Sequence, residues 1–261
     1  MQRKVITKLY GVIGNPLIHS YSPAFFQEKF KEKHIDSSYY VKFELSRIED
    51  IINVLNQNSN LRGLNVTIPY KETIIPYLTE IDDDARNIGA VNVVKIDKDA
   101  EDKLILKGYN SDWYGFKKSI ETKLKPWHKK ALVLGTGGAS KGIIYALKQL
   151  NIEYQYVSRK PKEGCITYDD LNEDYFKQYK IIINTTPVGT FPNVKACPEI
   201  PYEYITKEHL VYDLIYNPIR SLFLHQAELK EATICNGWEM FVYQALRSYK
   251  IWENIDWIHK F

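Results

Sequence analysis

Residues 129–161, KKALVLGTGGASKGIIYALKQLNIEYQYVSRKP, form the stretch that decides the fold of this chain. The apolar run ALVL leads into the glycine cluster GTGGAS, after which Ile143, Leu147 and Leu150 recur at the spacing of one helix face. A second strand-like run, YQYVS, closes the stretch. A strand, a glycine turn, a helix and a strand in this order predict one βαβ unit of a parallel sheet.

The glycine cluster follows a strand and opens a helix, which is the context in which such a turn binds phosphate groups. Gly135 permits a tight turn, Gly137 and Gly138 let the backbone approach a pyrophosphate, and the helix N-terminus offers unpaired N–H groups. Ser140 replaces the third glycine of the usual fingerprint, so the helix–sheet contact there should differ. We therefore expect a dinucleotide site, with a glycine turn that binds no ligand as the alternative.

The end of the second strand separates the two nicotinamide dinucleotides. An NAD site usually carries an acidic residue there to bind the ribose hydroxyls, whereas a 2′-phosphate requires cationic donors. Here the strand ends in Ser158, Arg159 and Lys160, with no carboxylate in the expected place. The sequence therefore favours NADP over NAD, and an exposed basic turn is the alternative explanation of Arg159 and Lys160.

A similar alternation of strands and helices precedes this unit. The run KLYGVIG predicts a strand over residues 8–14, and SPAFFQEKFKEKH predicts a helix over residues 22–34 with Ser22 as its cap and Pro23 in its first turn. The following runs predict a strand, a helix and a strand, over residues 37–45, 46–58 and 61–69. This pattern predicts a mostly parallel sheet whose ligands gather beyond the carboxyl ends of its strands.

The rest of the chain completes a second α/β unit. Residues 179–187 and 209–218 contain short apolar runs that are typical of buried parallel strands, and residues 237–252 have a helical period that suits docking onto the first unit. The expected fold class is therefore α/β with two domains. The domains predicted are residues 1–108, completed by 238–261, and residues 109–237.

Composition and charge exclude several classes of protein. A chain of 261 residues that is 44% hydrophobic is long enough to bury a sizeable core, and a formal net charge of +3 gives no footprint for nucleic acid. The three cysteines have neither a C-x-x-C pair nor metal-ligand spacing, no apolar run is long enough to span a membrane, and the N-terminus lacks the apolar run of a signal peptide. We expect a cytoplasmic protein without a metal site, either a monomer or a homodimer.

Eight segments, in order and over nearly the whole chain, resemble the motifs of the shikimate dehydrogenase family. They are GNPLIHSYSP (14–23), GLNVTIPYKE (63–72), IGAVNVV (88–94), YNSDWYGF (109–116), LGTGGASKG (134–142), INTTPVGT (183–190), VYDLIYNP (211–218) and NGWEMFVYQA (236–245). Ser111 stands where the family often has threonine, and Trp113 and Tyr114 are bulkier than usual. Any single segment of this kind can arise by chance, but eight in register are highly specific.

The resemblance implies an N-terminal α/β substrate-binding domain, a Rossmann-like NADP-binding domain, and a last helix that returns to the first domain. The implied reaction is the reversible NADPH-dependent reduction of 3-dehydroshikimate to shikimate, a step of chorismate and aromatic amino acid biosynthesis, with Lys71 and Asp112 at the reacting centre. Ser20 and Ser22 would hold the substrate carboxylate. The implied substrate-binding residues are Ser20, Ser22, Asn65, Thr67, Lys71, Asn92, Asp112, Tyr216 and Gln244.

The cofactor site expected from the residues and from the resemblance comprises three groups. The glycine turn supplies Gly135, Thr136, Gly137, Gly138, Ala139 and Ser140, and the basic turn supplies Ser158, Arg159 and Lys160. The resemblance adds Thr185, Thr186, Pro187, Leu214 and Gly237, and it places Tyr216 and Gly237 near the nicotinamide.

The sequence leaves three questions open: the proton donor, the choice of substrate and cofactor, and whether the chain is an enzyme. The sequence does not say which of Lys71 and Asp112 donates the proton. The wider family includes quinate/shikimate dehydrogenases that accept quinate or NAD, and Ser111, Trp113 and Tyr114 bear on the shape of the pocket. A binding or regulatory protein that kept the ligand pocket and lost turnover is the alternative from another class, but the presence of both Lys71 and Asp112 argues against it.

Overall fold

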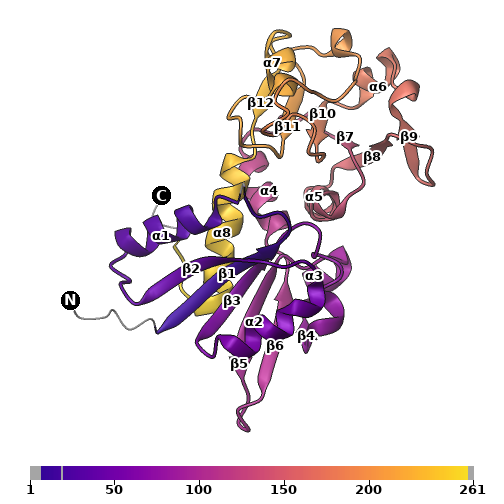
Figure 1. The fold of residues 1–261 in the computed structure, drawn as a ribbon. Helices are drawn as coiled ribbons and strands as arrows, with labels where there is room; N and C mark the ends of the chain where they lie inside the picture. Colours follow the sequence, from indigo (N-terminus) through magenta and orange to yellow (C-terminus); the bar gives the residue numbers. More distant parts are fainter. Residues whose placement is uncertain (1–6, 19, 258–261) are drawn as a thin grey trace. The chain divides into compact units, whose positions relative to one another are not determined.

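The computed structural model describes residues 7–18 and 20–257, which divide into two compact units. Unit 1 comprises residues 1–111 and 245–261, and unit 2 comprises residues 112–244. Within the described residues each unit has one six-stranded sheet (Figure 1). Residues 1–6, the start of the segment that we expect to lack a signal peptide, lie outside the described residues.

Unit 1 is built on a mixed sheet with the strand order β2-β1-β3-β5-β6-β4. Its strands are β1 (Lys8–Gly14), β2 (Ser38–Glu44), β3 (Leu61–Val66), β4 (Glu80–Ile81), β5 (Val93–Lys98) and β6 (Leu104–Tyr109). Its helices are α1 (Ser22–Glu32), α2 (Ile51–Gln57), α3 (Asp83–Ile88), the 3-10 helices η1 (Ile48–Asp50) and η2 (Ile75–Tyr77), and the second half of α8 (Trp238–Glu253).

The predicted parallel arrangement is confirmed for β1, β2 and β3, because β1 runs parallel to both of its neighbours. The sheet then continues with β5, which is antiparallel to β3 and to β6. The short connection between β5 and β6, residues 99–103, is long enough for a hairpin but too short for a parallel crossover. Because β4 is parallel to β6, β5 alone among the described strands of this sheet runs against the others, and the prediction of a mostly parallel sheet is confirmed.

Helices cover both faces of the unit 1 sheet (Figure 1). Apolar side chains of α2 and α3 pack with β1 and β3 on one face. On the other face Tyr10 of β1 stacks on Trp252 of α8 with 5.1 Å between the ring centroids, and Phe30 of α1 lies 5.7 Å from Tyr10. Trp252 also donates its indole N–H to the carbonyl oxygen of Val94 at 3.1 Å. This aromatic layer confirms the predicted return of the last helix to the first domain.

Unit 2 is built on a fully parallel sheet with the strand order β12-β11-β10-β7-β8-β9. Its strands are β7 (Lys130–Leu134), β8 (Glu153–Ser158), β9 (Cys165–Thr167), β10 (Ile181–Asn184), β11 (Leu210–Asp213) and β12 (Thr233–Cys235). Its helices are α4 (Asp112–Glu121), α5 (Gly138–Gln149), α6 (Glu173–Gln178), α7 (Leu222–Glu228), the 3-10 helices η3 (Tyr168–Asp170) and η4 (Tyr202–Tyr204), and the first half of α8.

The strand order of unit 2 is that of a Rossmann fold. Counted from β7, the strands lie in the order 3-2-1-4-5-6, which confirms the predicted fold class. Apolar side chains of α4 and α5 cover one face of the sheet, and those of α6 and α7 cover the other. The strand order reverses between β7 and β10, so the loops after these two strands mark the switch point where ligands of such sheets bind.

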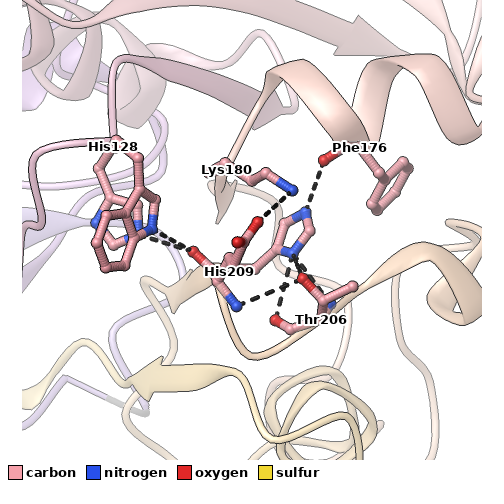
Figure 2. Close-up of polar contacts among 7 residues, drawn as sticks. His128, Phe176, Lys180, Thr206 and His209 are labelled. Atoms are coloured by element: carbon pink, nitrogen blue, oxygen red, sulfur yellow. Dashed lines mark hydrogen bonds and ion pairs between the residues drawn. The ribbon is translucent and has the colours of Figure 1, made fainter.

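Two histidines lie at the opposite, amino-terminal edge of this sheet (Figure 2). His128 lies two residues before β7, and His209 lies directly before β11. Each accepts a backbone N–H at Nδ1, His128 from Lys125 and His209 from Thr206, both at 3.0 Å. Each Nε2 then donates to a carbonyl oxygen, that of Glu208 or that of Phe176. Both rings are therefore held as neutral imidazoles, because a proton on Nδ1 would meet a backbone donor.

Burial reinforces this neutral state. It lowers the pKa of His209 to about 4, with Lys180 contributing in the same direction, and it also lowers the pKa of His128. A histidine whose pKa is lower in the folded state than its value near 6.5 in the unfolded state stabilises the fold at pH values above 6.5. This stability is lost as the pH falls toward 4.

We predict that acid weakens unit 2 through His209. Lowering the pH from about 7.5 to about 5 should reduce the free energy of unfolding by about 2 kcal/mol through this residue, since the unfolded chain takes up the proton first. Urea unfolding at both pH values measures the effect, and His209→Gln should remove most of it. An unchanged pH dependence in that variant would contradict the prediction.

Candidate functional site

The glycine turn after β7 adopts a conformation that requires glycine. Gly135 has a φ of 101°, and a Cβ on it would lie 2.7 Å from Cγ2 of Thr186. Gly137 precedes α5 with an ordinary φ of −81°, and a Cβ on it would meet no atom within 4 Å. The turn is thus closely packed at Gly135 and open at Gly137, the position beside the N-terminus of the 12-residue helix α5 where a phosphate would bind.

Ser140, at the third glycine position, is buried in the first turn of α5. Its hydroxyl donates to the carbonyl oxygen of Gly137 at 2.7 Å, and it also hydrogen-bonds to Tyr156 of β8. A serine is tolerated here because its hydroxyl has these partners. The helix–sheet contact therefore includes polar bonds that a glycine would not make.

The basic turn after β8 presents its cations to solvent. Arg159 and Lys160 are both exposed, whereas Ser158 is buried and hydrogen-bonds to both the carbonyl oxygen and the backbone N–H of Lys160. Ser158 therefore shapes the turn that carries the two cations. Guanidinium and ammonium groups on an ordered turn suit a phosphate monoester.

The threonine loop after β10 lies against the glycine turn. Thr185 donates its backbone N–H and its hydroxyl to the carbonyl oxygen of Leu134, at 3.0 and 2.7 Å. Thr186 is held through Asn184, whose Oδ1 accepts from its backbone N–H at 3.0 Å. Pro187 follows and is exposed. The structure thus brings together the cofactor residues predicted from the two motifs, 50 residues apart in the chain.

The residues predicted near the nicotinamide gather where β11 and β12 end. Tyr216 lies 5.2 Å from the ring of Phe241 and 6.1 Å from that of Trp238. Gly237 donates its backbone N–H to the carbonyl oxygen of Ile215 at 3.0 Å. A Cβ on Gly237 would overlap the carbonyl oxygen of Leu214, so the start of α8 depends on this glycine to approach the loop after β11.

In unit 1, two predicted substrate residues belong to one buried polar network. Asn65, at the end of β3, donates to Oγ of Ser248 at 2.9 Å and to the carbonyl oxygen of Asn92 at 3.3 Å. Oδ1 of Asn92 accepts the backbone N–H of Ser111 at 2.6 Å, and the hydroxyls of Ser111 and Ser248 lie 3.2 Å apart. The structure therefore joins the end of β3, the start of β5 and the end of β6 through these amides.

Tyr40 extends this network to the serine segment. Its hydroxyl donates to Oδ1 of Asn65 at 2.7 Å and hydrogen-bonds to the side chain of Ser22, and burial holds its pKa far above the usual range. The prediction of Ser22 as a helix cap was wrong, because Tyr21 occupies the cap position and the Ser22 side chain is engaged by Tyr40. The part that Tyr40 and Ser248 play in this network was not predicted from the sequence, since neither residue lies in one of the eight segments.

The remaining predicted residues of unit 1 follow β1 and β3. Ser20 lies in the loop after β1 and donates its backbone N–H to the carbonyl oxygen of Leu17 at 3.1 Å. Thr67 directly follows β3, and Lys71 comes one turn later, half-buried, with its carbonyl oxygen accepting from Val91 N at 2.7 Å. These strands are parallel, so their carboxyl ends lie at one edge of the sheet, as predicted.

Asp112 and Gln244 belong to unit 2. Asp112 is the first residue of α4 and is buried, while Gln244 is half-buried on α8. The two helices approach closely at Gly115, where a Cβ would lie 2.6 Å from the carbonyl oxygen of Met240 and 2.9 Å from Cβ of Gln244. Gly115 stands one helical turn after Asp112, so both predicted residues lie on this helix pair.

The bulky Trp113 packs into unit 2. Its ring lies 5.4 Å from that of Tyr145 on α5 and 6.1 Å from that of Tyr114, and it joins the core formed by α4 and α5.

The three cysteines are free thiols. Residues 7–18 and 20–257 contain neither a cluster of three metal-ligating side chains nor a helix long and apolar enough to cross a membrane.

A Rossmann unit with this glycine turn, a basic turn after its second strand and an α/β partner unit defines a nicotinamide-dinucleotide-dependent oxidoreductase. Residues 12–94 match the model of the shikimate dehydrogenase substrate binding domain. The chain is 40% identical to an NADP(+) shikimate dehydrogenase of Methanococcus maripaludis, over 94% of this chain and 91% of that protein. This chain therefore belongs to the shikimate dehydrogenase family.

Solved structures agree with this assignment. A crystal structure of a shikimate dehydrogenase in complex with NADP+ superposes with a TM-score of 0.84 at 32% identity, covering 96% of this chain and 91% of that one. A shikimate 5-dehydrogenase of Thermus thermophilus, solved with NADP(H) and shikimate, gives a TM-score of 0.81 at 27% identity, covering 95% and 94% of the two chains. The predicted family and fold are thus confirmed.

We predict that alanine has different effects at two positions of the glycine turn, lowering stability at one and NADPH binding at the other. Gly135→Ala should destabilise unit 2 by more than about 1 kcal/mol, because its φ is positive and the added methyl meets Thr186. Gly137→Ala should leave the unfolding temperature nearly unchanged but weaken NADPH binding, since its methyl fills the open space beside α5. Thermal unfolding and titration with NADPH separate the two effects, and equal destabilisation by both variants would contradict the prediction.

Proposed function

We propose that this chain catalyses the reversible NADPH-dependent reduction of 3-dehydroshikimate to shikimate. The observation that carries the proposal is the match to NADP(+) shikimate dehydrogenases over more than nine-tenths of both chains. The side chains that such a reaction requires are present, with Lys71 in unit 1 and Asp112 at the start of unit 2. An enzyme is thus favoured over a binding protein that lost turnover.

The carboxyl edge of the unit 2 sheet suits NADP. Gly137 leaves open space beside the N-terminus of α5, and the exposed Arg159 and Lys160 supply cations where a 2′-phosphate would lie. No acidic residue stands at the end of β8 to bind an unphosphorylated ribose. When bound, NADPH supplies the hydride, and the remaining chemistry belongs to the side chains of this protein.

In the proposed mechanism the protein stabilises charge and moves one proton. Negative charge develops on the carbonyl oxygen of the ketone during reduction, and the Lys71 ammonium stabilises this charge. Lys71 and Asp112 together deliver the proton that completes the hydroxyl group, and in the oxidation direction the same pair accepts it. The hydroxyls of Ser20 and Ser22 hold the substrate carboxylate, while Asn65, Thr67, Asn92, Tyr216 and Gln244 line the rest of the substrate site.

One spectrophotometric assay tests the function. Reduced cofactor is followed by its absorbance with shikimate or quinate as substrate and NADP+ or NAD+ as cofactor, in all four combinations. The proposal expects the highest kcat/KM with shikimate and NADP+. Higher kcat/KM with quinate or with NAD+ would favour a quinate/shikimate dehydrogenase, and binding of shikimate without any turnover would favour a regulatory protein.

Replacing Lys71 tests the proton-transfer role. Lys71→Ala should lower kcat by a factor on the order of 10² or more while changing the KM for shikimate less, as loss of general acid catalysis does. Lys107→Ala is the matched control, because Lys107 is a half-buried lysine of unit 1 that pairs with Glu80 at 3.1 Å. Near-normal turnover in Lys71→Ala would rule out the mechanism.

Replacing Arg159 tests the choice of cofactor. Arg159→Ala should raise the KM for NADPH about tenfold or more and leave the KM for NADH almost unchanged, because only the former carries the 2′-phosphate. Lys177→Ala, which removes an exposed cation of α6 that pairs with Glu173, is the control. An equal rise in both constants would remove the assignment of Arg159 to the phosphate.

A further inference from the structure

Asp213 is a fully buried carboxylate that no part of the proposed mechanism uses. It is the last residue of β11, and its partners are all neutral donors. Oδ1 accepts from Nδ2 of Asn184 at 3.0 Å and from the backbone N–H of Ile215 at 3.1 Å, and Oδ2 accepts from the Ser221 hydroxyl at 2.5 Å. Burial raises the pKa of Asp213 to about 6 in spite of these three donors.

An ionised carboxyl group only accepts hydrogen bonds, so it orients every donor around it. Asn184 must turn Nδ2 toward Asp213 and therefore presents Oδ1 to the threonine loop. That Oδ1 accepts from both the backbone N–H and the hydroxyl of Thr186, at 3.0 and 2.6 Å. The position of Thr186 therefore depends on Asp213 through the orientation of the Asn184 amide.

The threonine loop in turn determines where the glycine turn lies. Thr185 binds the carbonyl oxygen of Leu134 through its hydroxyl at 2.7 Å, and Thr186 contacts the position of the missing Cβ of Gly135. Because Gly135 has a positive φ and no side chain, these two threonines contact the turn directly. A shift of Asn184 would therefore move the turn that is proposed to bind the pyrophosphate.

On its other side Asp213 holds both ends of the loop that carries Tyr216. Ile215 is bonded through its backbone N–H, and Ser221 is bonded through a hydroxyl that also accepts the N–H of Leu224 at 3.3 Å and so caps α7. The loop between these anchors, residues 216–220, includes the tyrosine assigned to the nicotinamide side. One carboxylate therefore connects the threonine loop after β10 with the Tyr216 loop after β11.

We propose that Asp213 and Asn184 are positioning residues that set the threonine loop and the Tyr216 loop against the glycine turn for binding of NADP(H). This role rests on the cofactor site of the proposed function and deepens it. Packing alone does not require a charge here, since an apolar side chain of the same volume would avoid the cost of burying one. An acceptor-only group is required if three donors are to be oriented at once.

The test compares variants of the Asp213–Asn184 pair, at the ends of β11 and β10, with a variant on the opposite face of β11. Asp213→Asn and Asn184→Ala should each raise the Kd and the KM for NADPH about tenfold. In Asn184→Ala, which leaves the Tyr216 loop bonded to Asp213, the KM for shikimate should stay nearly unchanged. The double variant should bind NADPH no more weakly than the worse single variant, because both act through one network. Tyr212→Phe is the control: it removes a buried 2.7 Å hydrogen bond to Ser119 on the opposite face and should leave NADPH binding unchanged.

Thermal unfolding of each variant is measured in parallel, and Ser221→Ala serves as a milder change if Asp213→Asn does not fold. A normal Kd for NADPH in folded Asp213→Asn or Ser221→Ala would overturn the positioning role. An equal loss of NADPH binding in Tyr212→Phe would also overturn it, because general loosening of the sheet would then explain the effect. If the unaltered chain showed no saturable NADPH binding, the proposed function would fail and this role with it.

Discussion

The contact between Gly135 and the side chains of Thr185 and Thr186 is the constraint on which the carboxyl edge of unit 2 depends. It exists because β7 and β10 are neighbours in the sheet, and because the turn after β7 has a positive φ that only glycine adopts readily. The contact occurs at the point where the strand order reverses, so the two loops diverge beyond it. A ligand that binds here meets backbone N–H groups and helix α5.

Unit 1 is organised by buried amides. Asn65 and Asn92 use both ends of their side chains to join strand ends that are remote in the chain, and Tyr40 links them to Ser22. Buried amides and hydroxyls are tolerated because each has partners, and the described residues contain no buried side-chain nitrogen or oxygen without one. A polar layer of this kind fixes the loops after β1 and β3 before any ligand binds.

Local patterns in the sequence were sufficient for the glycine turn, the basic turn and most strands, because each of these follows from neighbouring residues. Longer-range features were not predictable in this way. Ser248 bonds to Asn65 across 183 residues, which no motif spacing indicates, and Ser22 was assigned as a cap because Tyr40 is invisible in the local sequence. The antiparallel direction of β5 was not predicted, because the alternation of strands and helices in the preceding residues indicates parallel strands.

A crystal structure of this chain with NADP+ and shikimate bound tests the proposed cofactor and substrate sites most directly. We predict that this structure has the pyrophosphate beside Gly137 and the N-terminus of α5, the 2′-phosphate against Arg159 and Lys160, and the shikimate carboxylate on the hydroxyls of Ser20 and Ser22. Electron density that places the adenosine ribose away from the basic turn, or the substrate away from Lys71, would contradict this prediction.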